Sequence, residues 1–144
     1  MQLRNRRLRQ SVSRRESVVS GTNANKMIVA DAYAALRDGD AKGFLGVLHP
    51  DIVVQEPEFL PYGGVCNGLE EFMEKLPVAR TVVDSSRLEI LALTAEDDRV
   101  AALLRVGVRD SEATVDMSEH WRLVDGKAVE LRAFWASAAP STPG

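Results

Sequence analysis

The sequence predicts an α+β domain in which helices come first and a largely antiparallel sheet follows. Two observations support this fold class. In the first half of the 144-residue chain, apolar residues recur near the helical period, and from Arg87 onward the pattern changes to strand-like runs separated by turns. Hydrophobic residues make up 45% of the chain, which is enough for one domain to bury a core. We therefore expect helices packed on one face of a curved sheet.

Three helices are expected before the sheet. The first spans residues 26–37 and ends at the Asp-Gly-Asp turn of residues 38–40. The second spans residues 41–48 and ends before His49 and a proline. The third spans residues 69–76 and follows a turn rich in glycine. Each segment gathers its apolar side chains on one face, as a helix that covers a core does.

The strands are recognised by their β-branched residues. A run that includes Val53 ends at Glu56, because the following Pro57 cannot donate a ladder hydrogen bond. The later strands are expected at residues 88–93, 100–108, 114–124 and 128–135. Asp125-Gly126 separates the last two strands and is a strong signal for a two-residue hairpin.

The ends of the chain differ in composition from its body. Residues 1–22 are rich in Arg and Ser, and residues 138–144 form a short end with two prolines, so disordered tails are expected on both sides of a domain at residues 23–137. Residues 1–16 contain six arginines and one glutamate, whereas the rest of the chain carries 12 basic and 20 acidic side chains. This acidic body argues against nucleic acid as a partner.

Several other functions are disfavoured. No apolar run approaches the length that spans a bilayer, and the arginine-rich segment lacks an export signal, so we expect no membrane partner and a cytoplasmic location. Cys66 is the only cysteine, which leaves no internal disulfide and no cysteine-based zinc site. His49 and His120 lie on different elements and do not form a metal site. No dinucleotide or phosphate-loop motif is present, and we expect no cofactor.

Glu56 is the first candidate for chemistry. It closes a β-branched run, and Pro57 holds it extended, so its carboxylate has a fixed direction. Gly63 and Gly64 then allow tight turns around Tyr62. A carboxylate at a strand end beside an aromatic hydroxyl is typical of a pocket wall. The alternative is a glutamate on an edge strand that faces water.

Glu119 is the second candidate. In the strand at residues 114–124, the alternation of side chains places Glu119 on the apolar face with Trp121 and places His120 on the other face. A carboxylate on a buried face must be protonated, paired with a cation or directed into a polar cavity. Arg105 and Arg132, from the neighbouring strands, are the candidate cations, and a structural salt bridge is the alternative to catalysis.

The last strand carries bulky groups on both faces. We expect one face, with Glu130, Arg132 and Phe134, to line the cavity and to bind substrate together with Arg105 and Trp121. The opposite face carries the apolar residues Val129, Leu131 and Trp135. An exposed apolar stripe of this kind usually marks an interface, so we expect a homodimer formed through the sheet.

The order of these pieces resembles a known family. The chain contains AYAALRDGDAKGFLGVLHPDIVVQEP, then LPYGGVCNG, then EHWRLVDGKAVELRAFW. Over about residues 25–136, this succession resembles the NTF2-like superfamily and, within it, the SnoaL-like polyketide cyclase group. The resemblance implies a cone-shaped α+β barrel that encloses one apolar pocket, commonly in a homodimer. Because members of one fold differ in function, the site residues must decide the activity.

The resemblance also implies roles for particular positions. In SnoaL-like relatives an Asp often follows the final aromatic pair, and here that position is Ala136. The arginine and aspartate pattern of limonene-type epoxide hydrolases is incomplete around Arg105. In the ketosteroid isomerase group, an Asp before Pro at the end of the first strand is the general base, and Glu56 takes the matching place. The oxyanion tyrosine of that group would fall at Ala32, whereas Tyr33 lies on a different helical face.

We therefore expect a cofactor-free enzyme of the SnoaL-like class, an isomerase, cyclase or dehydratase that acts on an apolar carbonyl-containing substrate such as a polyketide or terpenoid. Glu56 would remove or relay a proton, and Tyr62, Arg105 and Glu119 would stabilise the oxyanion or orient the substrate. The alternative is a non-catalytic module of the same fold, which binds a small ligand or dimerises and in which Ala136 reflects lost chemistry.

Overall fold

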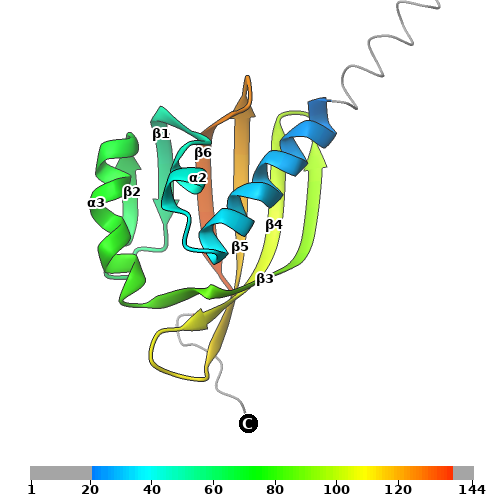
Figure 1. The fold of residues 1–144 in the computed structure, drawn as a ribbon. Coiled ribbons are helices and arrows are strands. Elements are labelled where there is room, and N and C mark those ends of the chain that lie inside the picture. Colours follow the sequence, from blue (N-terminus) through cyan, green and yellow to red (C-terminus); the bar gives the residue numbers. More distant parts are fainter. Residues whose placement is uncertain (1–20, 138–144) are drawn as a thin grey trace, which may run out of the picture.

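The computed structural model describes residues 21–137, and Figure 1 shows their arrangement. Three helices are present in this range. Residues 21–37 are helical and form what we term the N-terminal helix. A short helix, α2 (Ala41–Leu45), follows at once, with the Asp40 carboxylate accepting a hydrogen bond from the Gly43 N–H as its cap. The third helix, α3 (Leu69–Arg80), comes after the first two strands.

Six strands form a single sheet. They are β1 (Leu48–Glu56), β2 (Gly64–Asn67), β3 (Val83–Glu96), β4 (Arg99–Val108), β5 (Thr114–Val124) and β6 (Lys127–Trp135). Their spatial order is β2-β1-β6-β5-β4-β3. Neighbouring strands are antiparallel except β1 and β6, which run parallel in the middle of the sheet. The parallel pair brings the end of β1 beside the end of β6, where the candidate site lies.

All three helices lie on the same face of this curved sheet (Figure 1). We call this face the inner face and the opposite one the outer face. The N-terminal helix crosses β4 and β5, and α3 packs against β1 and β2. Side chains between the helices and the inner face form the hydrophobic core, in which Tyr33, Ile52 and Trp121 are almost fully buried. Their burial is the main source of stability of this domain.

The structure confirms the α+β class and several boundaries. The strand predicted at residues 114–124 is β5 (Thr114–Val124). Asp125 and Gly126 both have positive φ, of 50° and 78°, as a two-residue hairpin of this twist requires. The second helix is shorter than predicted, because Leu48 already belongs to β1 and its side chain faces the core.

Other expectations were wrong in detail. The glycine-rich segment was predicted as turns only, yet residues 64–67 form β2, which pairs with β1 as an edge strand. Helix α3 continues to Arg80, past the predicted end, although Pro77 lies inside it and cannot donate a helical hydrogen bond. The six strands form an open sheet with edge strands β2 and β3, and not the cone-shaped barrel that was expected.

The predicted tails lie almost wholly outside the described residues. Only residues 21 and 22 of the segment 1–22 are described, and they belong to the N-terminal helix. The segment 138–144 lies outside the described range. Within residues 21–137, no helix is both long enough and apolar enough to cross a lipid bilayer.

Candidate active site

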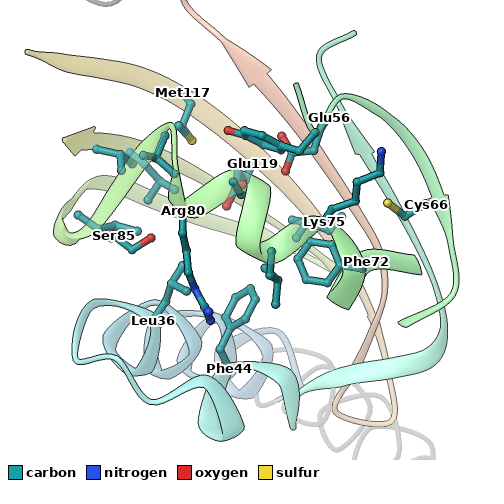
Figure 2. Close-up of a pocket in the computed structure, with 18 of the residues that line it drawn as sticks. Leu36, Phe44, Glu56, Cys66, Phe72, Lys75, Arg80, Ser85, Met117 and Glu119 are labelled. Atoms are coloured by element: carbon teal, nitrogen blue, oxygen red, sulfur yellow. The ribbon is translucent and has the colours of Figure 1, made fainter. Parts of the chain in front are cut away.

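A cavity of about 120 Å³ lies between the helices and the inner face of the sheet. Its lining is mostly apolar, and Figure 2 shows its side chains converging from the sheet and from α3. The polar members of the lining are few, which makes each one a candidate for ligand contact. They are Glu56, Tyr62, Cys66, Lys75, Arg80, Ser85, Glu119 and Trp135.

Glu56 faces this cavity because of the alternation in β1. Ile52 and Val54 are fully buried on the inner face, and Glu56 is the next residue on that face. Burial disfavours the charged carboxylate, and the nearby Glu119 adds to the effect, so the pKa of Glu56 rises from 4.5 to about 8. Glu56 therefore ends β1 and lines the cavity.

Glu119 enters the same cavity from β5. The Tyr33 hydroxyl donates a hydrogen bond of 2.7 Å to Oε1 of Glu119. The Trp121 Nε1–H donates in turn to the Tyr33 oxygen, also at 2.7 Å, and the two rings meet edge to face with centroids 5.5 Å apart. Burial raises the pKa of Glu119, and the Tyr33 hydrogen bond opposes that rise. These contacts hold the carboxyl group in one orientation.

The two carboxyl groups form a pair without a cation. Their side chains come from different strands and extend toward one cavity (Figure 2). No salt bridge among residues 21–137 includes Glu56 or Glu119. Because both pKa values are raised, the pair retains at least one proton near neutral pH. Such a pair can both donate and accept a proton.

Tyr62 lies in the loop that connects β1 to β2 and is 6% exposed. Burial raises the pKa of its hydroxyl, and Glu56 and Glu119 add to the rise, so the group stays protonated and can donate. The loop is tight. A Cβ at Gly63 would lie 2.1 Å from the Pro57 carbonyl oxygen, so only glycine fits the turn that brings Tyr62 to the cavity.

Cys66 and Trp135 are among the polar members of the lining that were not predicted from the sequence as site residues. Cys66, on β2, is buried, and burial raises the pKa of its thiol, which makes it a poor nucleophile. The Nε1 atom of Trp135 is buried without a hydrogen-bond partner among the described residues. Trp135 also meets Phe59, an exposed residue of the β1–β2 loop, edge to face at 5.8 Å.

None of the five predicted substrate-binding residues lines the cavity, and four of them lie on the outer face of the sheet. Arg105 pairs with Asp116 at 2.8 Å, with both side chains well exposed, so it is not the partner of Glu119. Glu130 accepts a hydrogen bond from Arg122, and the Arg132 guanidinium lies 4.8 Å from the centre of the Phe134 ring. Arg105, Glu130, Arg132 and Phe134 therefore lie on the outer face.

For Glu130, Arg132 and Phe134, the error lies in which face of β6 was assigned to the cavity. Both of its faces carry bulky groups, so alternation alone does not identify the inner one. The pairing with β5 decides it, because Trp121 is opposite Leu131 and directly paired residues share a face. Leu131 and Trp135 consequently line the cavity and do not form the expected interface stripe. Trp121 is on the inner face as predicted, but it acts on the site through Tyr33.

Tyr33 is the site residue that the sequence analysis missed. It was set aside because Ala32, one residue earlier, matched the tyrosine position of a related group. In the structure both residues are about 1% exposed, since the helix buries a wide face against the sheet. The signal was available in the spacing, because Val29, Tyr33 and Leu36 fall on one helical stripe.

The histidines lie outside the cavity. His49 Nδ1 accepts a hydrogen bond of 3.0 Å from the Asp51 N–H. His120 is on the outer face as predicted, where its ring is 2.8 Å from the Ser118 hydroxyl. Among residues 21–137, no group of three or more potential metal ligands comes together.

Comparisons with known proteins agree with this architecture. The SnoaL-like domain family matches residues 29–131, which is more than half of the chain. No curated protein matches the sequence. An NTF2-like protein of unknown function from Burkholderia pseudomallei has a similar structure, with a TM-score of 0.67 and 24% identity over 78% of this chain and 90% of that one.

Two further solved structures are similar. An NTF2-like protein from Burkholderia xenovorans is 25% identical, with a TM-score of 0.64 over 79% of this chain and 90% of its own. TerC, which was co-crystallised with polyporic acid, is 28% identical, with a TM-score of 0.65 over 78% of this chain and 91% of its own. These proteins share the NTF2-like fold with the chain.

Proposed function

Because the chain belongs to the SnoaL-like domain family, we propose that it is a cofactor-free enzyme that moves a proton on a small, apolar carbonyl compound. The proposal covers isomerase, cyclase and dehydratase reactions, since each begins with removal of a proton beside a carbonyl group. The main support is the pair of largely desolvated carboxyl groups, Glu56 and Glu119, that faces one cavity and forms no salt bridge with the described residues.

The hydrogen bonds suggest how the pair divides its roles. Tyr33 donates to Glu119, which favours the ionised form of that carboxyl group. The shared proton then resides on Glu56, whose pKa of about 8 keeps it protonated at neutral pH. Glu119 accepts a proton from the carbon beside the substrate carbonyl. Glu56 and the Tyr62 hydroxyl donate hydrogen bonds to the enolate oxygen that forms. Return of the proton to another atom completes an isomerisation.

The cavity favours a substrate of about one ring. Its volume of about 120 Å³ is close to the roughly 150 Å³ of an engineered cavity that holds benzene. TerC, a solved structure of similar fold, was co-crystallised with polyporic acid, which is consistent with an organic ligand for this fold. A larger molecule would need the β1–β2 loop, where Phe59 is exposed, to move aside.

Exchange of carbon-bound hydrogen tests the proposal without knowledge of the natural substrate. In deuterium oxide, a base beside the bound ketone 1-indanone would remove a proton from the adjacent carbon, and deuterium would replace it. Proton NMR should detect exchange by the full chain. Glu56→Gln and Glu119→Gln should each slow the exchange roughly 10²- to 10⁴-fold. Glu58→Gln, at an exposed position of the β1–β2 loop, is the control and should catalyse exchange at the parent rate.

The binding module is the competing function, and one observation favours it. The position where SnoaL-like relatives often carry an Asp is occupied by Ala136, which is exposed at the end of β6. Quenching of Trp121 and Trp135, the only two tryptophans, would report ligand binding. Binding of 1-indanone with exchange no faster than in buffer would overturn the enzyme and support the module.

We also propose that the chain forms a homodimer through the outer face of the sheet. Phe134 on β6 and Leu103 on β4 are both 44% exposed there. Ser118 on β5 lies between them in register. Apolar side chains exposed on a sheet face favour burial against a second copy. This surface replaces the stripe that was expected around Trp135.

A further inference from the structure

Helix α3 presents two cations to a cavity that is otherwise mostly apolar. Five residues of the helix line the cavity, and their spacing of three and four marks a single helical face. They are Phe72, Lys75, Leu76, Ala79 and Arg80. Three of these positions hold the apolar residues that a cavity wall normally has. Lys75 and Arg80 depart from that pattern.

Neither cation has an acidic partner. Among residues 21–137, Arg87, Arg105, Arg109 and Arg122 all form salt bridges with carboxylates. No salt bridge in that range includes Lys75 or Arg80. Arg80 is exposed to water, whereas Lys75 is half-buried. The Lys75 ammonium group is therefore the less hydrated of the two and has more to gain from an anion.

Lys75 reaches the cavity from a different element than the carboxyl pair does. Figure 2 shows its side chain extending from α3 toward Cys66 on β2. Its charge is felt at the Cys66 thiol, where it opposes the rise in pKa that burial causes. Glu56 and Glu119 enter from β1 and β5. The pair retains a proton on Glu56, and Glu119, which carries the remaining charge, forms no salt bridge with Lys75. The lining therefore holds a positive group from α3 in addition to the proton-transfer groups from β1 and β5.

We propose that the ligand of this cavity is a small carbonyl compound with an anionic group, a carboxylate or an ionised enol, that binds to Lys75. The inference rests on the proposed function for the carbonyl end, which lies against Glu56 and Glu119. For the anionic end it rests on Lys75 alone. A single ring separates the two groups, in keeping with the cavity volume of about 120 Å³.

A matched pair of probes tests the anionic group. The first probe is 3-oxoindane-1-carboxylate, and the second is its carboxamide, which has the same ring and ketone but no charge. Binding to the full chain is followed by quenching of Trp121 and Trp135. The carboxylate should bind roughly tenfold more tightly, as a hydrogen bond to a charged group predicts. Added salt should weaken the binding of the carboxylate probe and leave the binding of the carboxamide unchanged.

Lys75→Met should remove this preference and leave carboxamide binding unchanged, which also shows that the variant is folded. Lys26→Met, at an exposed position of the N-terminal helix, is the control and should behave as the parent. An ionised enol is tested with 1,3-cyclohexanedione against cyclohexanone. Preference for the enol alone would identify that form of the anion.

Equal affinity for the charged and neutral member of both pairs would overturn the inference, and so would a preference that survives Lys75→Met. These outcomes are separate from failure of the proposed function, because binding is measured without turnover. A charge preference with no hydrogen exchange would support the anion site and contradict the proposed enzyme activity. Exchange of 1-indanone with no charge preference would support the enzyme activity and contradict the anion site.

Discussion

Replacement of Glu56 by Gln should change how the stability of the protein depends on pH. The pKa of Glu56 rises from 4.5 to about 8 on folding, because burial and Glu119 both disfavour its charge. Below about pH 4.5 the group is protonated in both states and adds no pH dependence. Between about 4.5 and 8 the folded chain holds a proton that the unfolded chain has released, so stability falls as pH rises. Above about pH 8 the group is ionised in both states, and the loss of stability no longer changes with pH.

The size of the effect follows from the same linkage. Each pH unit inside this window should lower the free energy of unfolding by about 1 kcal/mol. For a domain of this length, that corresponds to roughly 3–5 °C in Tm for each unit. The side-chain amide introduced by Glu56→Gln does not titrate, so the substitution should remove this contribution. The variant should match the parent near pH 5 and exceed it in stability at pH 8.

Thermal and urea unfolding across this pH range would measure the difference between the two proteins. Groups that do not interact with Glu56 cancel in the difference, and Asp84 and Asp116, whose pKa values are lowered by hydrogen bonds from Ser86 and Arg105, titrate below the window. Glu58→Gln serves as the control, because Glu58 is exposed in the β1–β2 loop, two residues after Glu56. If the parent and Glu56→Gln lost stability with pH at the same rate, Glu56 would not be the buried, protonated group described above.

Two further outcomes are expected from the contacts. Tyr33→Phe removes the donor to Glu119 and leaves the buried Trp121 Nε1–H without its acceptor, so urea unfolding should show a loss of about 1–3 kcal/mol. The Tyr62 hydroxyl has no hydrogen-bond partner among residues 21–137, so Tyr62→Phe should lower the free energy of unfolding by less. An equal loss in both variants would argue that the hydrogen bonds of Tyr33 with Glu119 and Trp121 do not stabilise the domain. Phe134→Glu should turn a dimer into a monomer in sedimentation experiments, whereas Val124→Glu, equally exposed at the hairpin end, should not. A monomeric parent protein at micromolar concentration would contradict the proposed interface.

The elements that could be predicted from the sequence were those with strong local signals. The alternation in β5 has a polar side chain at every second position, so the inward direction of Glu119 followed directly. Asp125-Gly126 specified the hairpin because few residues adopt positive φ at two successive positions. Glu56 was placed correctly because Pro57 ends its strand. In each case the decisive information lies within a few residues of the chain.

The remaining features depend on distant contacts. Local alternation left both faces of β6 possible, and only its pairing with β5 turned Leu131 and Trp135 inward. Strand β2 has four residues, begins with a glycine and forms because β1 offers it a free edge. The contact of Tyr33 with Glu119 joins residues 86 positions apart. A helical stripe indicates that Tyr33 is buried, but it does not identify the strand residue that it meets.

The carboxyl pair is difficult to explain as part of the folding scaffold. Two acidic groups that face one cavity without a cation lower the stability of the domain, because each must be desolvated or kept protonated. Apolar residues of similar size would pack there at lower cost, as they do at the neighbouring Val54 and Met117. The domain nevertheless holds Glu119 in place through Tyr33, which is itself fixed by Trp121. A costly group that is held this firmly is expected at a functional site, where a defined proton position contributes to binding or reaction.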